Sequence, residues 1–297
     1  MKNTTSGHLA ALFTIIIWGT TFISTKILLT GFAPLEILFF RFVMGFCALL
    51  AISPKLLHTT DKKQELTFAA AGLTGICLYY LLENIALTFT QASNVGVITS
   101  TAPFFTALLA HFCLSSEERL HKQFIFGFLI VMLGISCISF NGAELHLNPL
   151  GDLLAVSAAI VWAFYSLLTK KIGSFGYPVI LATRRTFFYG IIFMLPALGF
   201  LDFEWKLARF AVATYLFNIV FLGLGASALC FVTWNYAVKE IGAVKASVYI
   251  YMVPVITVIT SVIVIGERLT LLAGIGTLLT MLGLFLSEYR PQKKIVK

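Results

Sequence analysis

Ten apolar stretches follow one another along the chain, and only short polar segments separate them. They lie at about residues 8–29, 34–53, 66–89, 92–114, 122–141, 150–170, 178–200, 209–238, 243–264 and 269–288. Each approaches or exceeds the ~20 residues that a helix needs to cross a ~30 Å hydrocarbon core. The pattern predicts an all-α integral membrane protein with ten transmembrane helices and no separate aqueous domain.

The second half of the chain repeats the first. At shifts of 144 to 151 residues, several identities recur: Trp18 with Trp162, Pro34 with Pro178, Arg41 with Arg185, Asn84 with Asn235, and Pro103 with Pro254. The units are residues 1–145 and 146–297, with five spans each. Because five is odd, the second unit must enter the membrane from the opposite side. This predicts an inverted-topology repeat, which is the architecture of carriers that work by alternating access.

The composition supports a lipid environment. The chain is 59% hydrophobic and 11% charged, with a mean hydropathy of +0.94, which excludes a soluble domain. The net charge of +8 would suit nucleic acid, but no exposed basic patch with interleaved aromatic residues occurs. We therefore expect the lipid bilayer, and not nucleic acid, as a partner.

The basic residues divide unequally between the two sides of the ten-span topology. Fourteen lie on the side of the termini: Lys2, Lys55, Lys62, Lys63, Arg119, Lys122, Lys170, Lys171, Lys239, Lys245, Arg290, Lys293, Lys294 and Lys297. Four lie on the other: Lys26, Lys206, Arg209 and Arg268. Since Lys and Arg accumulate in cytoplasmic loops, we expect both termini and the loops around Lys62 and Lys239 to be cytoplasmic. The loops around Glu144 and Asp202 are then external.

No motif for catalysis, cofactor binding or metal binding is found. The five cysteines have no metal-binding spacing and all lie within predicted spans, where we expect free, buried thiols: Cys47, Cys77, Cys113, Cys137 and Cys230. No HExxH motif, phosphate loop or nucleophile elbow occurs. The first span lacks a small-residue cleavage site and is expected to be retained. The sequence thus favours a non-enzymatic membrane protein without a cofactor.

Several of these features resemble a known family. They are the paired tryptophans Trp18 and Trp162, the proline of the fourth span, the passage from Ala86 to Ser93, and the Glu-Arg-Leu passages that follow spans four and nine. Over residues 8–288 the chain resembles EamA-type members of the drug/metabolite transporter superfamily. One departure is that Pro103 precedes its Glu-Arg-Leu glutamate by 15 residues, against 13 for Pro254.

This resemblance implies a ten-helix carrier of a bacterial-type inner membrane. Spans one to four and six to nine would surround a central cavity, and spans five and ten would pack outside. Family members commonly export amino acids and other small metabolites. Glycines seven residues apart in spans five and ten, Gly127 with Gly134 and Gly276 with Gly283, are suited to close packing of these two helices.

Charged residues within the spans are the strongest candidates for function, since an ionisable group in hydrocarbon usually faces a partner or a wet cavity. Arg41 and Glu83 lie at a similar depth, ~9–11 Å below the outer boundary. We expect them to form an ion pair, which could be structural or could open for substrate. Glu83 is also the candidate proton-coupling group.

The second half breaks this symmetry, because Trp234 stands at the position equivalent to Glu83. Arg185 is therefore expected to lack a counter-charge and to bind a substrate carboxylate or close an inner gate. Its neighbour Arg184 points elsewhere around the helix and is expected to extend to the lipid headgroups.

Aromatic and proline residues complete the predicted site. Trp18 and Trp162 lie mid-span, where an indole N–H needs a partner that a polar cavity could supply. Further cavity candidates are Tyr79, Tyr165, Trp234 and Tyr249. Pro103 and Pro254 interrupt spans four and nine at equivalent places and are candidate flexing or gating points. Asn84 and Asn235 are expected to join helices.

These observations predict a secondary active transporter of small polar metabolites, and the resemblance implies an exporter of amino acids or related compounds. One alternative is a nucleotide-sugar or organic-phosphate exchanger, in which Arg41, Arg184 and Arg185 would bind phosphate. A more distant alternative is an intramembrane enzyme or a lipid scramblase. The sequence leaves open the substrate, proton coupling and whether two copies form a homodimer.

Overall fold

The structure of the protein, a computed structural model, describes residues 4–59, 61–89, 92–113, 122–139, 148–201, 203–264 and 271–288. All regular secondary structure in these residues is helical. The α-helices are α1 (Thr4–Leu28), α2 (Pro34–Ile52), α3 (Lys62–Ala71), α4 (Tyr79–Phe89), α5 (Ala92–Thr99), α6 (Ala102–Cys113), α7 (Lys122–Ser139), α8 (Pro149–Gly173), α9 (Val179–Met194), α10 (Ala213–Val220), α11 (Cys230–Ile241), α12 (Ala243–Val248), α13 (Val253–Val264) and α14 (Leu271–Glu288).

Several helices continue through turns of different pitch. Two segments are π-helical, η1 (Gly72–Leu78) and η5 (Phe221–Leu229). Three are 3₁₀-helical, η3 (Pro196–Gly199), η4 (Leu207–Ala211) and η6 (Tyr249–Met252). The third span thus begins at Lys62, four residues before its predicted start, because the Asp61 side chain accepts a hydrogen bond from the Lys63 N–H and caps the helix.

Six helical runs are long and apolar enough to cross a membrane: Thr4–Leu28, Pro34–Ile52, Lys62–Phe89, Pro149–Gly173, Val179–Gly199 and Ala213–Ile241. Shorter apolar helices occupy the other four predicted stretches, at Ala102–Cys113, Lys122–Cys137, Ala243–Ile256 and Gly274–Ser287. The Glu-Arg-Leu passages at 118–120 and 267–269, and the loop positions Glu144 and Asp202, lie outside the described residues. The described chain is therefore a multi-pass membrane protein.

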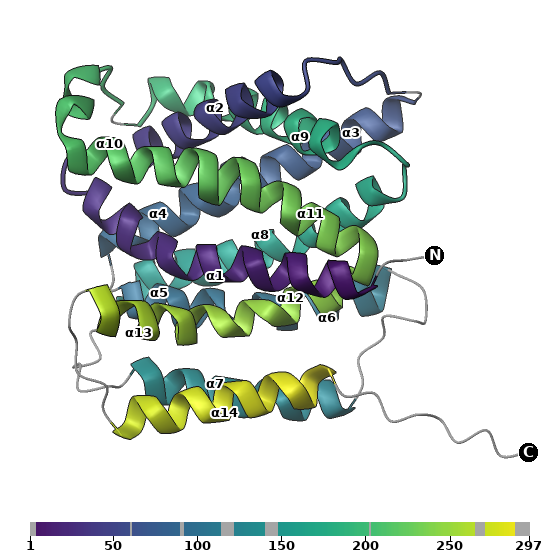
Figure 1. Cartoon of the computed structure of the whole chain (residues 1–297), viewed down its shortest axis with the longest axis vertical. Coiled ribbons are helices and arrows are strands. Elements are labelled where there is room, and N and C mark those ends of the chain that lie inside the picture. The colour runs from purple at the N-terminus through teal and green to yellow at the C-terminus, as the bar shows by residue number, and fades with distance from the viewer. Residues whose placement is uncertain are drawn as a thin grey trace, which may run out of the picture.

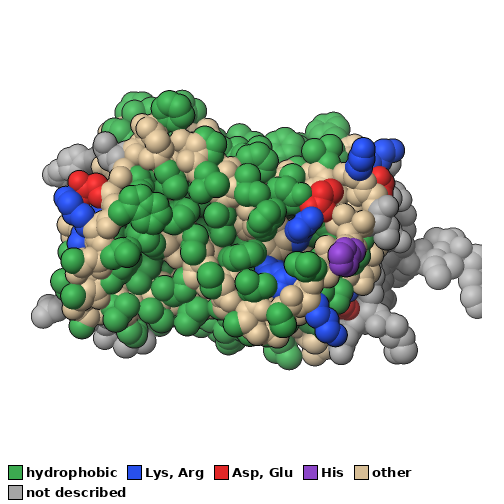
Figure 2. Space-filling view, turned by 90° about the horizontal axis from the view of Figure 1, so that it is seen from above, with side chains coloured by type: hydrophobic (Ala, Val, Ile, Leu, Met, Phe, Trp, Pro, Cys, Tyr) green, Lys and Arg blue, Asp and Glu red, His purple; other side chains and the backbone are tan. Residues whose placement is uncertain are grey.

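The outer surface matches this assignment. Figure 2 shows a face covered mainly by hydrophobic side chains, with charged side chains gathered toward its two ends. Large apolar side chains such as Phe13, Phe126 and Phe217 are exposed on the helices, as expected where lipid is the solvent. Cys47 and Cys113 are also exposed, which corrects the expectation that every thiol is buried.

The helices of the two halves pack across each other. In Figure 1 they lie side by side, and the start of α1 and the end of α14 are at the same end of the bundle. The first helix α1 packs on α11 and α13, whereas its repeat equivalent α8 packs on α4 and α6. Likewise α2 packs on η5 and α9 packs on η1. The core between them is therefore shared by both halves.

Helices α7 and α14 form a separate pair at one edge of the bundle (Figure 1). A Cβ atom at Gly134 would lie 2.6 Å from the Gly276 carbonyl oxygen, and one at Gly283 would lie 2.7 Å from the Gly127 carbonyl oxygen. Glycine is required at these contacts because any side chain would overlap backbone atoms. The predicted packing role of the glycine stripe is confirmed.

The predicted interruptions at the two prolines are also confirmed. The fourth span divides into α5 and α6 just before Pro103, and the ninth passes through the 3₁₀ turn η6 just before Pro254. Proline cannot donate the backbone hydrogen bond that would continue each helix. In the fourth span, the Ser100 and Thr99 hydroxyls donate to the carbonyl groups of Gly96 and Val95, so these hydroxyls lie at the break.

Candidate functional site

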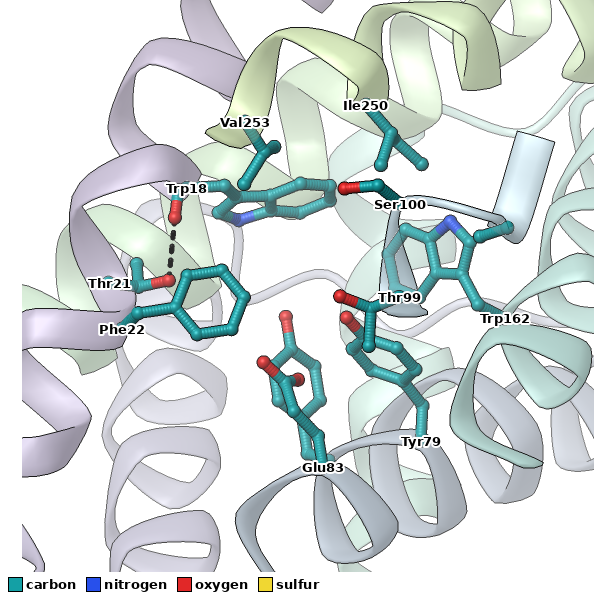
Figure 3. A pocket seen from close by; sticks show the side chains of 12 residues that line it. Trp18, Thr21, Phe22, Tyr79, Glu83, Thr99, Ser100, Trp162, Ile250 and Val253 are labelled. Carbon is teal, nitrogen blue, oxygen red and sulfur yellow. Dashed lines mark hydrogen bonds between the residues drawn. The ribbon is translucent and has the colours of Figure 1, made fainter. Parts of the chain in front are cut away.

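A central cavity lies where five of the helical runs meet (Figure 3). Its empty space, including the part open to the surface, is about 500 Å³. The lining side chains are Trp18, Thr21, Phe22, Tyr79, Tyr80, Glu83, Thr99, Ser100, Ala102, Trp162, Ile250 and Val253. Both halves of the chain contribute, and both proline interruptions border it.

Three tryptophans cluster beside this cavity, and two of them line it. The Trp18 ring lies 5.3 Å from that of Trp162 and 5.2 Å from that of Trp234, measured between centroids. Trp18 and Trp162 line the cavity, whereas Trp234 is fully buried and packs against Trp18. The edge and tilted contacts are geometries that aromatic pairs favour.

The two indole N–H groups differ in their surroundings. Trp18 Nε1 donates to the Ala226 carbonyl, at 2.9 Å, in the π-helical segment η5. There the Cys230 N–H donates to Gly225 and Ser227 rather than to Ala226, its α-helical partner, which leaves the Ala226 carbonyl accessible. Trp162 Nε1 is buried and has no protein partner. A backbone carbonyl, and not the cavity, therefore satisfies one of the two.

Glu83 carries the only charge among the described side chains on the cavity wall. Its carboxylate points into the cavity in Figure 3, from α4 toward Phe22 and the tryptophans. The side chain is 7% exposed, and Oε2 has no hydrogen-bond donor. Burying an unsatisfied carboxylate oxygen is costly, so this atom marks a place where a ligand group could bind.

Arg41 and Glu83 do not form the predicted ion pair, although both are described and buried. Arg41 Nε instead donates to Ser227 Oγ at 2.9 Å, and its guanidinium lies 4.4 Å from the Tyr80 ring centroid. One nitrogen, Nη2, has no partner. The sequence predicted the depth of the two residues but not their direction around the helices, and η5 offered Arg41 another acceptor.

Arg185 has a counter-charge, although comparison of the two repeats predicted that it would lack one. Its guanidinium forms an ion pair with Glu65, 2.5 Å from Nη2 to Oε1, and the Tyr189 hydroxyl donates to the same oxygen. Glu65 lies in α3, just before the start of the predicted third span. The expectation that Arg184 extends to the lipid headgroups is also corrected. Its side chain is buried and donates hydrogen bonds to the Ser53 and Lys55 carbonyls, which follow α2.

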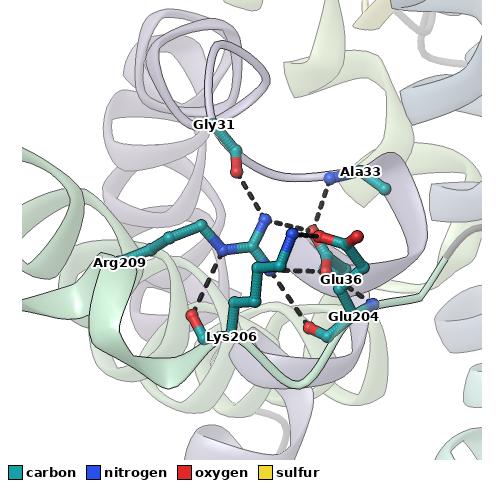
Figure 4. A network of polar contacts seen from close by, with 6 residues as sticks. All are labelled: Gly31, Ala33, Glu36, Glu204, Lys206 and Arg209. Carbon is teal, nitrogen blue, oxygen red and sulfur yellow. Dashed lines mark hydrogen bonds and ion pairs between the residues drawn. The ribbon is translucent and has the colours of Figure 1, made fainter.

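A second polar network was missed entirely by sequence reasoning (Figure 4). Glu36, 1% exposed, receives two hydrogen bonds from Arg209, 2.6 Å and 3.1 Å long. It also accepts from the Ala33 and Glu204 N–H groups. The network joins the start of α2 to the segment around η4. A glutamate three residues after the helix cap, next to Pro34, was the available signal.

Three other predicted site residues stand outside the cavity wall. Tyr165 is fully buried, and its hydroxyl donates to Asn235 Oδ1 at 2.8 Å. Tyr249 hydrogen-bonds His8 through its hydroxyl at 2.7 Å. The third residue is Trp234. All three lie near the cavity but do not line it. Both asparagines join helices as predicted, Asn235 to Tyr165 and Thr183 and Asn84 to the Pro34 carbonyl.

A smaller hollow lies farther along α8. It is lined by Thr169, Ile172, Gly173, Tyr177, Val179, Ala182, Thr186, Asn235 and Lys239. On α8, Trp162 lines the central cavity and Thr169 lines this hollow, two turns or ~10 Å away. Tyr165, between them and bonded to Asn235, belongs to the packed layer that separates the two spaces.

Eight residues of the cavity lining were not predicted from the sequence. They are Thr21, Phe22, Tyr80, Thr99, Ser100, Ala102, Ile250 and Val253. Phe22 lies one turn from Trp18, and Tyr80 lies one turn from Glu83, so helical spacing could have found them. Thr99 and Ser100 lie beside the break at Pro103. Among the described residues, no cluster of three or more His, Cys, Asp or Glu side chains could hold a metal ion.

Apolar membrane-length helices around an internal cavity, whose described lining carries a single carboxylate, define a multi-pass membrane protein. The model of the EamA-like transporter family matches residues 5–140 and, a second time, residues 149–289. The chain therefore belongs to the EamA-like transporter family, within the drug/metabolite transporter superfamily, and it is a transporter.

Relatives and a solved structure agree with this assignment. An uncharacterized transporter of Archaeoglobus fulgidus is 26% identical, over 96% of this chain and 98% of the relative. A probable terminal-alkyne amino-acid exporter of Streptantibioticus cattleyicolor is 25% identical, over 95% and 93%. A crystal structure with 19% sequence identity matches at a TM-score of 0.78, covering 95% of this chain and 98% of that one. This last match supports the fold alone.

Proposed function

We propose that the chain is a secondary active transporter that exports amino acids or related small polar metabolites across the inner (plasma) membrane by alternating access. The observation that carries this proposal is the central cavity, which both halves of the chain line and in which Glu83 has an unpartnered oxygen. The amino-acid exporter among the relatives supports the same substrate class.

The proposal includes ten transmembrane helices arranged as two inverted five-helix units, residues 1–145 and 146–297. Two separate matches to the family model support this division. The crossed packing, α1 on α11 and α13 against α8 on α4 and α6, is what a two-fold related pair would produce. The positive-inside charge distribution supports cytoplasmic termini.

Alternating access would proceed through the layer that separates the two hollows. Trp162 lines the central cavity and Asn235 lines the smaller one, and Tyr165 contacts both residues. A rearrangement at the breaks before Pro103 and Pro254 would close the first space while opening the second. The ion pair of Arg185 with Glu65 is then a candidate inner gate.

We further propose that Glu83 couples export to the proton gradient. A buried carboxylate that faces the substrate cavity can hold either a proton or a substrate group, but not both at one oxygen. Release of one on binding of the other would link the two fluxes.

No observation favours the alternative functions. An organic-phosphate exchanger would need arginines that face the substrate, yet none of Arg41, Arg184 and Arg185 lines the central cavity. They contact Ser227, backbone carbonyls and Glu65 instead. For an intramembrane enzyme, the described cavity wall offers a single carboxylate without a partner base, nucleophile or metal ligand. A scramblase would need a polar groove that faces lipid.

The experiment compares metabolites outside cells that overproduce the intact chain, Glu83→Gln or Glu204→Gln. Glu204 is the control because its carboxylate is exposed in a loop and pairs with Lys206. Amino acids or related polar compounds should accumulate outside cells with the intact chain and with Glu204→Gln, but not with Glu83→Gln. Identical extracellular metabolites with the intact chain and with no overproduced protein would contradict the proposal.

A further inference from the structure

The described wall of the central cavity carries negative charge only. Glu83 is acidic, and no Lys, Arg or His occurs among the other described residues that line the space. Arg41 lies within electrostatic reach of Glu83, but it is held outside the lining by Ser227 and the Tyr80 ring. Arg41 therefore offsets the charge of the carboxylate without giving Oε2 a hydrogen bond.

The unsatisfied atoms on this wall define what a ligand must offer. Glu83 Oε2 is a buried acceptor without a donor, and Trp162 Nε1 is a buried donor without an acceptor. A ligand that supplies a charged N–H group to the first and an uncharged oxygen to the second would satisfy both. A carboxylate would meet an indole N–H but no cation, and it would lie in the same space as the Glu83 charge.

The aromatic walls favour the same ligand class. Figure 3 shows the Glu83 carboxylate between the rings of Phe22, Tyr79 and Trp18. Aromatic faces attract a cation most strongly when it is desolvated, and a cavity of this kind combines such faces with an anionic hydrogen-bond acceptor. This combination of side chains suits an ammonium group.

We propose that the cavity recognises its substrate by an ammonium group and an uncharged oxygen, and not by a carboxylate. Amino alcohols, amines and amino acids with a blocked carboxyl group bind at least as well as free amino acids. This inference rests on the proposed function for its relevance to transport, but it concerns equilibrium binding alone.

The test is calorimetric titration of the purified full-length chain with three matched probes. Phenylalaninol carries the ammonium group and a hydroxyl group. Phenylpropanol lacks only the ammonium group. Phenylalanine has a carboxylate in place of the hydroxymethyl group of phenylalaninol. Phenylalaninol should bind at least roughly tenfold more tightly than phenylpropanol and no more weakly than phenylalanine. Equal binding of phenylpropanol, a tenfold preference for phenylalanine, or no binding of phenylalaninol at millimolar concentration would overturn the inference.

Variants assign the effect to the carboxylate. Glu83→Gln should remove the preference for phenylalaninol over phenylpropanol, and Glu204→Gln should leave it unchanged. If Glu83→Gln does not fold, Glu83→Asp should reduce the preference while retaining part of it, and an unchanged preference would count against the inference. Because no flux is measured, intact binding without transport would contradict the proposed function and leave this inference standing.

Discussion

At the scale of single residues, the central question is how a membrane interior accommodates Glu83. Its carboxylate is 7% exposed and has one oxygen without a donor. Such an arrangement costs free energy in every state that lacks a ligand or a proton. The neighbouring charge of Arg41 reduces that cost, while its separation from the carboxylate keeps the oxygen available.

The first prediction concerns Glu83→Gln, which keeps the shape of the side chain but cannot titrate. Reconstituted in proteoliposomes, this variant should lose transport driven by a pH gradient and retain part of the exchange of substrate for substrate. The matched control is Glu204→Gln, which should behave as the intact chain. Gradient-driven transport by Glu83→Gln at the rate of the intact chain would leave Glu83 with a structural role only.

The second prediction concerns the residue that holds Arg41. Ser227→Ala leaves Arg41 Nε buried without its acceptor, and should destabilise the protein by about 1–2 kcal/mol. In the Arg41→Ala background the same change should cost about 1 kcal/mol less, since the bond is already absent. Thermal denaturation in detergent measures both effects, with Ser157→Ala as control, because the hydrogen bond from the Ser157 hydroxyl to the Leu153 carbonyl is exposed. Strict additivity would show that the two side chains do not interact.

At the scale of helices, two matched irregularities position the site. The π-helical segments η1 and η5 fall at equivalent places in the third and eighth spans, and the breaks before Pro103 and Pro254 fall at equivalent places in the fourth and ninth. In η5 the altered hydrogen bonding gives Trp18 a carbonyl acceptor. At η5 and at the break before Pro103, the irregular turns thus place polar backbone or hydroxyl groups beside the cavity.

The third prediction tests the packing of α7 against α14. Gly134→Ala would bring a Cβ atom to 2.6 Å from the Gly276 oxygen, so we expect a destabilisation of about 1–3 kcal/mol and a lower midpoint of thermal denaturation. Gly274→Ala, in α14, is the control because nothing lies within 4 Å of its Cβ position. Equal midpoints for both variants would mean that the close contact is absent.

Most of the helices and their interruptions could be predicted from helix periodicity and length. The apolar stretches, the proline breaks and the glycine stripe could all be derived from local sequence. The partners of Arg41, Arg184 and Arg185 could not, because the choice among acceptors at one depth depends on rotation of each helix. The π-helical segments were also missed, since they change that rotation without a proline or other plain sequence signal.

At the scale of the whole molecule, the two halves build one site together. Trp18 comes from the first half and Trp162 from the second, and their rings touch at the cavity wall. The repeat itself was visible in the sequence as matched residues, which made a shared central site predictable. Which aromatic residues line it was not predictable, because Tyr165 and Trp234 are of the same residue types as the lining residues but are fully buried outside the cavity wall.

The central claim is that this cavity opens alternately to the two sides of the membrane. In a cysteine-free background, Thr21→Cys places a thiol on the cavity wall, and Phe13→Cys places one on the exposed apolar face of α1. We predict that an impermeant thiol reagent modifies Thr21→Cys both in intact cells and in inverted vesicles, and that modification stops flux, whereas Phe13→Cys is not modified. Modification of Thr21→Cys from one side only, with and without substrate, would contradict the account.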